Sequence, residues 1–125
     1  MAKTFSLLLV LAVAASSALG YSNNCHGSSR CTKDMAPTCV SAYSRFTDGT
    51  IYTASTSRTY GNCAAIYRCN GLYPSGMTGS KLKNLFSQIY SAQGCKGCGS
   101  HAFNGGDCEV TLNYCSDCKD SGTPH

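Results

Sequence analysis

The chain has 125 residues, of which ten are cysteine, 42% are hydrophobic and 13% are charged, and its formal net charge is +4. This length fits one small domain and excludes large enzyme architectures such as α/β barrels. The sequence contains no charge run and no Pro-rich stretch, which argues against a disordered chain.

The first twenty residues have the three parts of a secretory signal peptide. Lys3 supplies the positive start, residues 5–15 form the apolar core, and Ala18-Leu19-Gly20 is a small-x-small cleavage pattern. The apolar run is shorter than the roughly 20 residues that a membrane-spanning helix needs. We therefore predict that residues 1–20 direct secretion, that residues 21–125 form one extracellular domain, and that the protein does not insert stably into a membrane.

The charges of this domain are few and scattered. Without residues 1–20, nine basic and six acidic side chains remain, so the net charge falls from +4 to +3. No cluster of Lys and Arg is dense enough to indicate nucleic-acid binding. A mildly basic surface still suits contact with acidic protein surfaces, so we expect a protein partner and no nucleic acid.

The cysteines predict how the fold is stabilised. All ten follow the signal peptide, and an even number in a secreted chain predicts up to five disulfides. Two Cys-x-x-Cys pairs, at 95–98 and 115–118, also match the spacing of a four-cysteine zinc site. The oxidising secretory route and the six further cysteines favour disulfides over zinc, and we expect no cofactor. The ten are Cys25, Cys31, Cys39, Cys63, Cys69, Cys95, Cys98, Cys108, Cys115 and Cys118.

In chain order, the sequence predicts a helix at 37–46, strands at 50–55 and 62–69, a helix at 78–93 and a strand at 108–114. The second helix has the clearest pattern, because Leu82, Leu85, Phe86 and Ile89 recur at helical spacing and Gly94 suits its end. The mixture predicts an α+β fold in which helices lie on one face of a mainly antiparallel sheet.

Three blocks of the sequence are similar to one protein family. They are Asn-Cys-His-Gly-Ser-Ser-Arg-Cys at 24–31, Gly-Cys-Lys-Gly-Cys-Gly-Ser at 94–100 and Val-Thr-Leu-Asn-Tyr at 110–114. In this order and spacing they resemble the fungal and viral killer toxins of the killer protein 4 type. The resemblance implies an α/β sandwich with about five antiparallel strands, two helices and five disulfides. It also implies the pairs Cys25–Cys95 and Cys31–Cys98 and leaves the other six cysteines unassigned.

The resemblance further implies a secreted monomer that binds a cell-surface protein and arrests the growth of competing cells without catalysis. In the family this target is a voltage-gated calcium channel. The toxins carry a basic cluster ahead of a middle strand, whereas residues 46–52 of this chain contain no basic residue. They also have a cysteine ahead of the long helix, which residues 70–76 lack, so some bridges must differ. The nearest candidates for target contact are Arg45 and Arg58, followed by Lys81, Lys83 and Lys96.

Other functions are compatible with a small secreted chain. A host-directed effector or a wall-binding protein would need no toxin activity, and some of the eight tyrosines could stack on sugars. A protease inhibitor would need only an exposed loop. A ribonuclease would need an acid, a base and a phosphate clamp, for which His26, His101 and Glu109 with Arg30 or Arg68 are available. We favour structural roles for His26, His101 and Glu109, because each lies in a segment whose pattern already explains it, and a solubilising surface role for Arg30 and Arg68.

Overall fold

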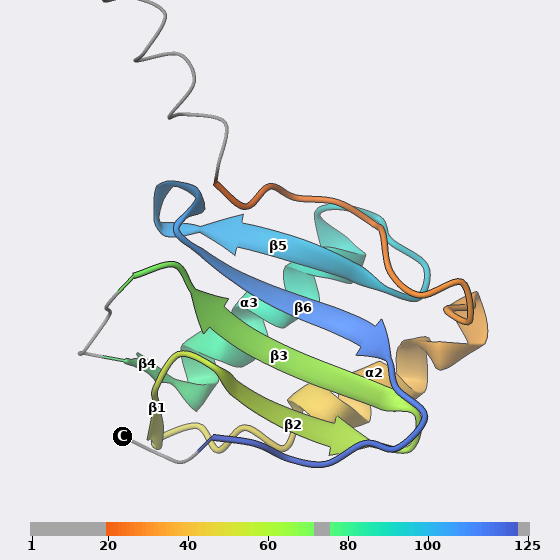
Figure 1. The fold of residues 1–125 in the computed structure, drawn as a ribbon, viewed down its shortest axis with the longest axis horizontal. Coiled ribbons are helices and arrows are strands. Elements are labelled where there is room, and N and C mark those ends of the chain that lie inside the picture. Colours follow the sequence, from red (N-terminus) through yellow and green to blue (C-terminus); the bar gives the residue numbers. More distant parts are fainter. Residues whose placement is uncertain (1–19, 72–75, 123–125) are drawn as a thin grey trace, which may run out of the picture.

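The computed structural model describes residues 20–71 and 76–122, so the predicted signal peptide, except Gly20, lies outside the described residues. Within this part of the chain, two α-helices lie on one face of a four-stranded antiparallel sheet (Figure 1), which confirms the predicted α+β fold. The elements are η2 (Lys33–Met35), α2 (Ala36–Tyr43), β1 (Ile51–Tyr52), β2 (Thr56–Tyr60), β3 (Cys63–Cys69), β4 (Met77–Thr78), α3 (Gly79–Ser91), β5 (Gly99–Phe103), η3 (Asn104–Gly106) and β6 (Cys108–Tyr114).

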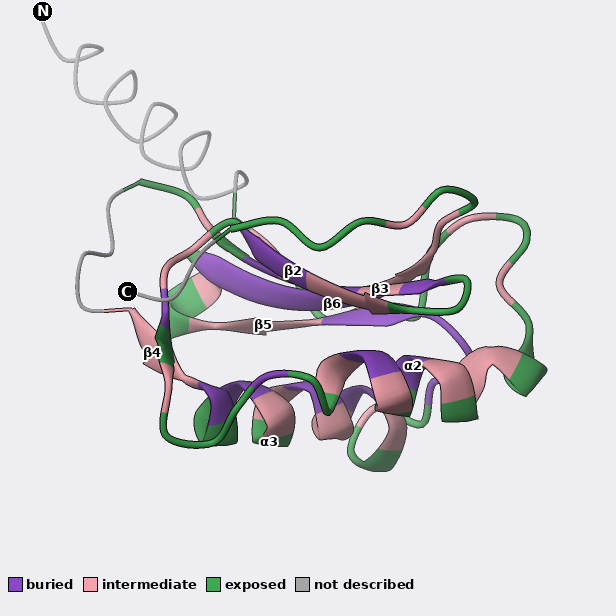
Figure 2. Ribbon diagram, turned by 90° about the horizontal axis from the view of Figure 1, so that it is seen from below, coloured by how far each residue is buried: buried purple, intermediate pink, exposed green. Residues whose placement is uncertain are grey.

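The two central strands place the core between the sheet and the helices. The strand order is β2-β3-β6-β5, and β3 pairs with β6 along its whole length. Ala65 lies opposite Leu112 and Tyr67 opposite Val110, and all four side chains are buried on the helix side because strand residues alternate between faces. Figure 2 shows the buried strands lying directly against the helix layer.

The edges of the sheet depart from the sequence prediction. β3 and β6 lie where strands are expected, but β1 is shorter than the expected strand at 50–55, and β2, β4 and β5 are not predicted. Segments 56–60 and 99–103 lack the apolar–polar alternation that predicts a strand, and in the structure they pair with the central strands β3 and β6. The main sheet therefore has four strands instead of about five, and bridges at Asn24–Ser100 and Ser57–Ser121 extend its two edges.

Helix α3 forms where its pattern predicts it. Thr78 Oγ1 accepts a hydrogen bond from the Lys81 backbone N–H at 3.3 Å and so caps the N-terminus. Gly94 follows the last turn with φ of +70°, a backbone conformation that favours glycine. The buried face includes Leu82 and Phe86, each fully shielded from solvent.

Helix α2 ends earlier than the sequence predicts. It stops at Tyr43 instead of residue 46, yet Tyr43 and Phe46 still pack on the ring of Phe86 from α3, with centroids 5.5 and 5.6 Å away. The chain therefore leaves the helix while keeping both aromatic rings in the core.

All ten cysteines lie among the described residues and form disulfides. The bonds are Cys25–Cys95, Cys31–Cys98, Cys39–Cys63, Cys69–Cys108 and Cys115–Cys118. The first two are the pairs that the killer-toxin resemblance implies. The four cysteines of the zinc pattern are all used in these bonds, and the described residues contain no group of three or more potential metal ligands.

None of the described helices is both long and apolar enough to cross a membrane.

Candidate functional site

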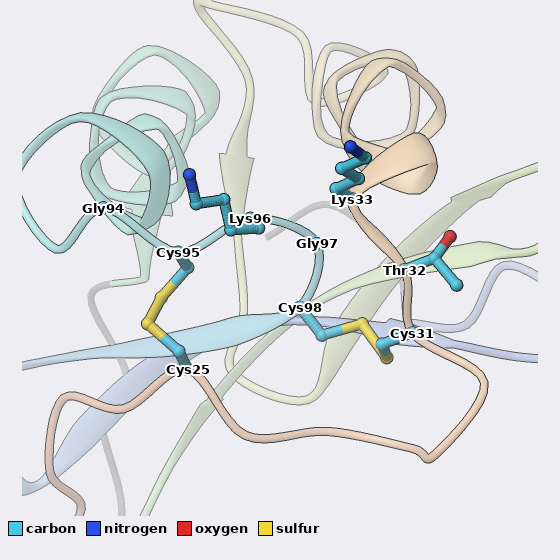
Figure 3. Close-up of a pocket in the computed structure, with 9 residues that line it drawn as sticks. All are labelled: Cys25, Cys31, Thr32, Lys33, Gly94, Cys95, Lys96, Gly97 and Cys98. Atoms are coloured by element: carbon cyan, nitrogen blue, oxygen red, sulfur yellow. A yellow bond between two sulfur atoms is a disulfide. The ribbon is translucent and has the colours of Figure 1, made fainter.

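An open hollow of about 270 Å³ lies between the two disulfides that join the N-terminal segment to the turn after α3 (Figure 3). A pocket for a drug-sized ligand typically has about 300–1,000 Å³, so this hollow suits a side chain of a partner better than a whole small molecule. Its lining residues are Cys25, Cys31, Thr32, Lys33, Gly94, Cys95, Lys96, Gly97 and Cys98.

The walls of the hollow are held in one geometry by close contacts as well as by the disulfides. A side chain at Gly97 would overlap the carbonyl oxygen of Thr32, so the two segments pack backbone to backbone. The Tyr90 hydroxyl donates a hydrogen bond to the Gly97 carbonyl at 2.6 Å. Burial raises the pKa of Tyr90 to about 12, and the nearby Tyr43 adds to the rise. The hydroxyl therefore remains a protonated donor at neutral pH.

Two lysines flank this hollow. Lys33 begins η2, and Lys96 lies between Cys95 and Cys98 in the turn after α3. Figure 3 shows both side chains rising on the same side of the hollow, from opposite walls. Neither forms an ion pair with any other described residue. Their positive charge is therefore available to a partner.

The two arginines that the sequence favours as contact residues are held by the protein itself. Arg45 Nη1 donates to Asp120 Oδ1 at 2.8 Å and to the Thr59 carbonyl at 2.7 Å. Arg58 lies over the rings of Phe46 and Tyr52, with its guanidinium carbon 5.8 and 5.3 Å from their centroids. The structure thus gives both arginines a stabilising role, and neither lies at the hollow.

The three lysines predicted to contact a target differ in their ion pairs and in their distance from the hollow. Lys83 pairs with Asp48, and its side chain is 28% exposed. Lys81 lines a smaller hollow of about 120 Å³ beside Ile51 and Met77, and it forms no ion pair with another described residue. Of the five predicted residues, only Lys96 borders the disulfide-walled hollow.

The structure separates His101 and Glu109, the two candidates for acid and base of a ribonuclease. His101 lies opposite Val110 in the β5–β6 register, so its side chain is on the helix face, where Nδ1 lies 2.7 Å from Gln93 Oε1. Burial lowers the pKa of His101. Glu109 is on the opposite face of the sheet and accepts a hydrogen bond from Arg68 Nε at 2.6 Å. His101 and Glu109 therefore cannot share one substrate as acid and base in this structure.

His26 and Arg30, the two remaining ribonuclease candidates, lie on the N-terminal segment. His26 lies on the exposed N-terminal segment, where its backbone N–H donates to Asn24 Oδ1 at 3.0 Å. Arg30 lies 5.6 Å from the centroid of the Tyr114 ring and donates to the Tyr114 hydroxyl at 3.3 Å. The Arg30 contacts join the N-terminal segment to the end of β6.

Sequence reasoning missed Lys33 as a site residue. Lys33 is more than sixty positions from Lys96, and nothing in the sequence joins them except the pairing of Cys31 with Cys98. That pairing is implied by the resemblance, so it could have singled out the basic residues on either side of these cysteines.

Comparison with known proteins gives one family. The sequence model of MU117, described as a meiotically up-regulated gene family, matches residues 23–118, a span that contains all ten cysteines. No curated protein and no solved structure matches the chain. Because the match covers most of the sequence and the whole disulfide framework, the chain belongs to the MU117 family.

Proposed function

We propose that this protein is a secreted, non-enzymatic inhibitor of the growth of competing cells, similar in action to the killer toxins that its cysteine blocks resemble. Its target is an acidic site on a cell-surface protein, and the resemblance makes a calcium channel the first candidate. The observation that carries the proposal is the disulfide-walled hollow, which presents Lys33 and Lys96 without an internal acidic partner among the described residues.

The disulfides support an extracellular site of action. Five disulfides in a chain of 125 residues are typical of small secreted proteins, because the cytosol keeps thiols reduced. Secretion itself follows from the predicted signal peptide at residues 1–20. A monomer without a cofactor remains part of the proposal.

The hollow supplies a physical route to binding. Its walls are covalently joined, so little conformational entropy is lost when a partner docks. Two ammonium groups beside a hollow attract a carboxylate ring such as lines the mouth of a cation channel. Calcium competes for the same carboxylates, so added calcium should relieve the inhibition.

Growth assays on a panel of fungi test this function. Protein is purified from the medium of cells that express the full chain, and recovery in the medium tests secretion at the same time. We expect the oxidised protein to inhibit at least one species, millimolar calcium to suppress the inhibition, and full reduction with alkylation to abolish it. Absence of inhibition in every species would overturn the toxin proposal and favour a host-directed effector or a wall-binding protein.

Matched variants then test the surface. K33Q/K96Q removes two positive charges at the hollow, and K81Q/K119Q removes two elsewhere from lysines that also form no ion pair with a described residue. We expect the first variant to lose most of the inhibition and the second to keep it. The reverse result would move the contact surface away from the hollow, to the surface around Lys81 or Lys119.

A further inference from the structure

One disulfide differs from the other four in span and in exposure. Cys115–Cys118 joins residues three apart, whereas the other bonds span 24 to 70 residues. Both of its cysteines are half-buried, and the intervening residues 116 and 117 are exposed. Cys25 is itself exposed, but each of the other four bonds has at least one buried cysteine: Cys95, Cys98, Cys108, or both Cys39 and Cys63.

This difference makes Cys115–Cys118 the bond that a thiol opens most readily. A thiolate must approach a sulfur atom in line with the S–S bond, which requires solvent access. Opening a short loop also returns little conformational freedom to the chain, so the rest of the fold loses little support. The four long-range bonds lack the second feature, and in each of them at least one sulfur belongs to a buried cysteine.

The bond lies at the start of a segment that covers an edge of the sheet. We call residues 119–122 the C-terminal strap. Ser121 exchanges backbone hydrogen bonds with Ser57 of β2 at 2.9 and 3.2 Å, and the two hydroxyls lie 2.8 Å apart. Asp120 Oδ1 accepts from the Thr59 backbone N–H at 2.9 Å. In Figure 1 the C-terminal segment runs along β2.

We propose that Cys115–Cys118 is a thiol–disulfide exchange site, and that its opening releases the C-terminal strap from β2. The reductant is a small thiol of the glutathione class. Its thiolate attacks one cysteine sulfur, forms a mixed disulfide with it and expels the other sulfur as a thiolate, which takes up a proton. A second thiol molecule then displaces the mixed disulfide, so two thiol molecules are oxidised to one disulfide while Cys115 and Cys118 become thiols.

Release of the strap changes what the edge of the sheet offers. The four-residue ring keeps the chain turned toward β2, and opening it lengthens the free segment that must find Ser57 and Thr59. Without the strap, the backbone N–H groups of these two residues lose their partners and become exposed on an edge strand. The exchange site would thus control whether β2 is covered.

The order of reduction tests the exchange site. The oxidised full-length protein is incubated with glutathione mixtures of increasing reducing power, and free thiols are alkylated and identified by mass spectrometry. We expect Cys115 and Cys118 to be alkylated about tenfold faster or more than the other eight cysteines. Earlier or simultaneous opening of any other disulfide would overturn the proposal.

Hydrogen exchange tests the link to the strap. After selective reduction we expect the Ser57 and Thr59 amides to exchange about tenfold faster or more, while amides between β3 and β6 keep their protection. Unchanged protection at Ser57 and Thr59 would refute the release of the strap. The variant D120N provides the matched control, because it loosens the strap at Thr59 while the disulfide stays closed. It should speed exchange at Thr59 without any alkylation.

Discussion

Asp120 Oδ1 accepts a hydrogen bond from Arg45 Nη1 at 2.8 Å, although the two residues are 75 positions apart in the sequence. The same oxygen also accepts from the Thr59 backbone N–H and hydroxyl, at 2.9 and 3.0 Å. One carboxylate therefore joins the C-terminal strap, strand β2 and the residues after α2.

The Asp120 contacts should make the strap sensitive to acid. Burial alone would raise the pKa of Asp120, but the hydrogen bonds from Arg45 and Thr59 and the charge of Arg45 outweigh burial and lower this pKa below its ordinary value of 3.8. Because the pKa of Asp120 is lower in the folded than in the unfolded state, its carboxylate contributes to the stability of the fold above about pH 4. This contribution is lost as the pH falls through the folded-state pKa. We expect the Thr59 amide to lose protection in that range.

The measurement is amide hydrogen exchange or NMR of Thr59 as a function of pH. D120N removes the titrating group, so its Thr59 signal should show no such acid transition. The same transition in D120N would assign the effect to another carboxylate.

Arg68 and Glu109 form a pair whose two members are unequally buried. The Glu109 side chain is 6% exposed and the Arg68 side chain 49%. R68M leaves the Glu109 carboxylate buried without its charged partner, so we expect a loss of about 1–3 kcal/mol in the free energy of unfolding. Adding E109Q to R68M removes that unpaired charge and should restore part of the loss. Urea unfolding of wild type, R68M and R68M/E109Q measures the loss and its partial recovery. Equal stability of R68M and wild type would show that Glu109 does not depend on Arg68.

Two glycines offer a matched test of packing at the start of α3. A side chain on Gly79 would overlap the backbone of Thr47, whereas a side chain on Gly49 would meet nothing within 4 Å. We expect G79A to destabilise the fold by about 1–3 kcal/mol through overpacking. G49A should change stability by less than about 0.5 kcal/mol, as surface substitutions usually do. Thermal unfolding of both variants measures the difference, and equal effects would show that Thr47 can move aside.

The disulfides should contribute unequally to the free energy of unfolding, because they close loops of different length. Cys25–Cys95 spans 70 residues, so the chain-entropy model gives its removal in C25S/C95S a loss of about 4 kcal/mol. Cys115–Cys118 spans three residues, and C115S/C118S should lose about 2 kcal/mol or less on the same model. Denaturant unfolding compares the two, and a larger loss in C115S/C118S would contradict the order.

Elements whose pattern is local can be predicted from the order of the amino acids. The spacing of Leu82, Phe86 and Ile89 defines the buried face of α3, and the alternation in residues 108–114 defines β6. The even number of cysteines predicted full pairing, which the structure confirms. Helical and strand periods are readable because they depend on neighbours in the sequence. Full cysteine pairing is readable because it follows from an even number of cysteines behind a predicted signal peptide.

Contacts between residues far apart in the chain became visible in the folded structure alone. Strands β2 and β5 pair with β3 and β6, although neither segment shows the apolar–polar alternation that predicts a strand from sequence. Arg45 and Arg58 are held internally because the strap and two aromatic rings pack beside them. The hollow forms where residues 25–33 meet residues 94–98 through two disulfides. Sequence periodicity carries no information on these long-range contacts, because they depend on how helices and strands pack against one another and not on the order of neighbouring residues.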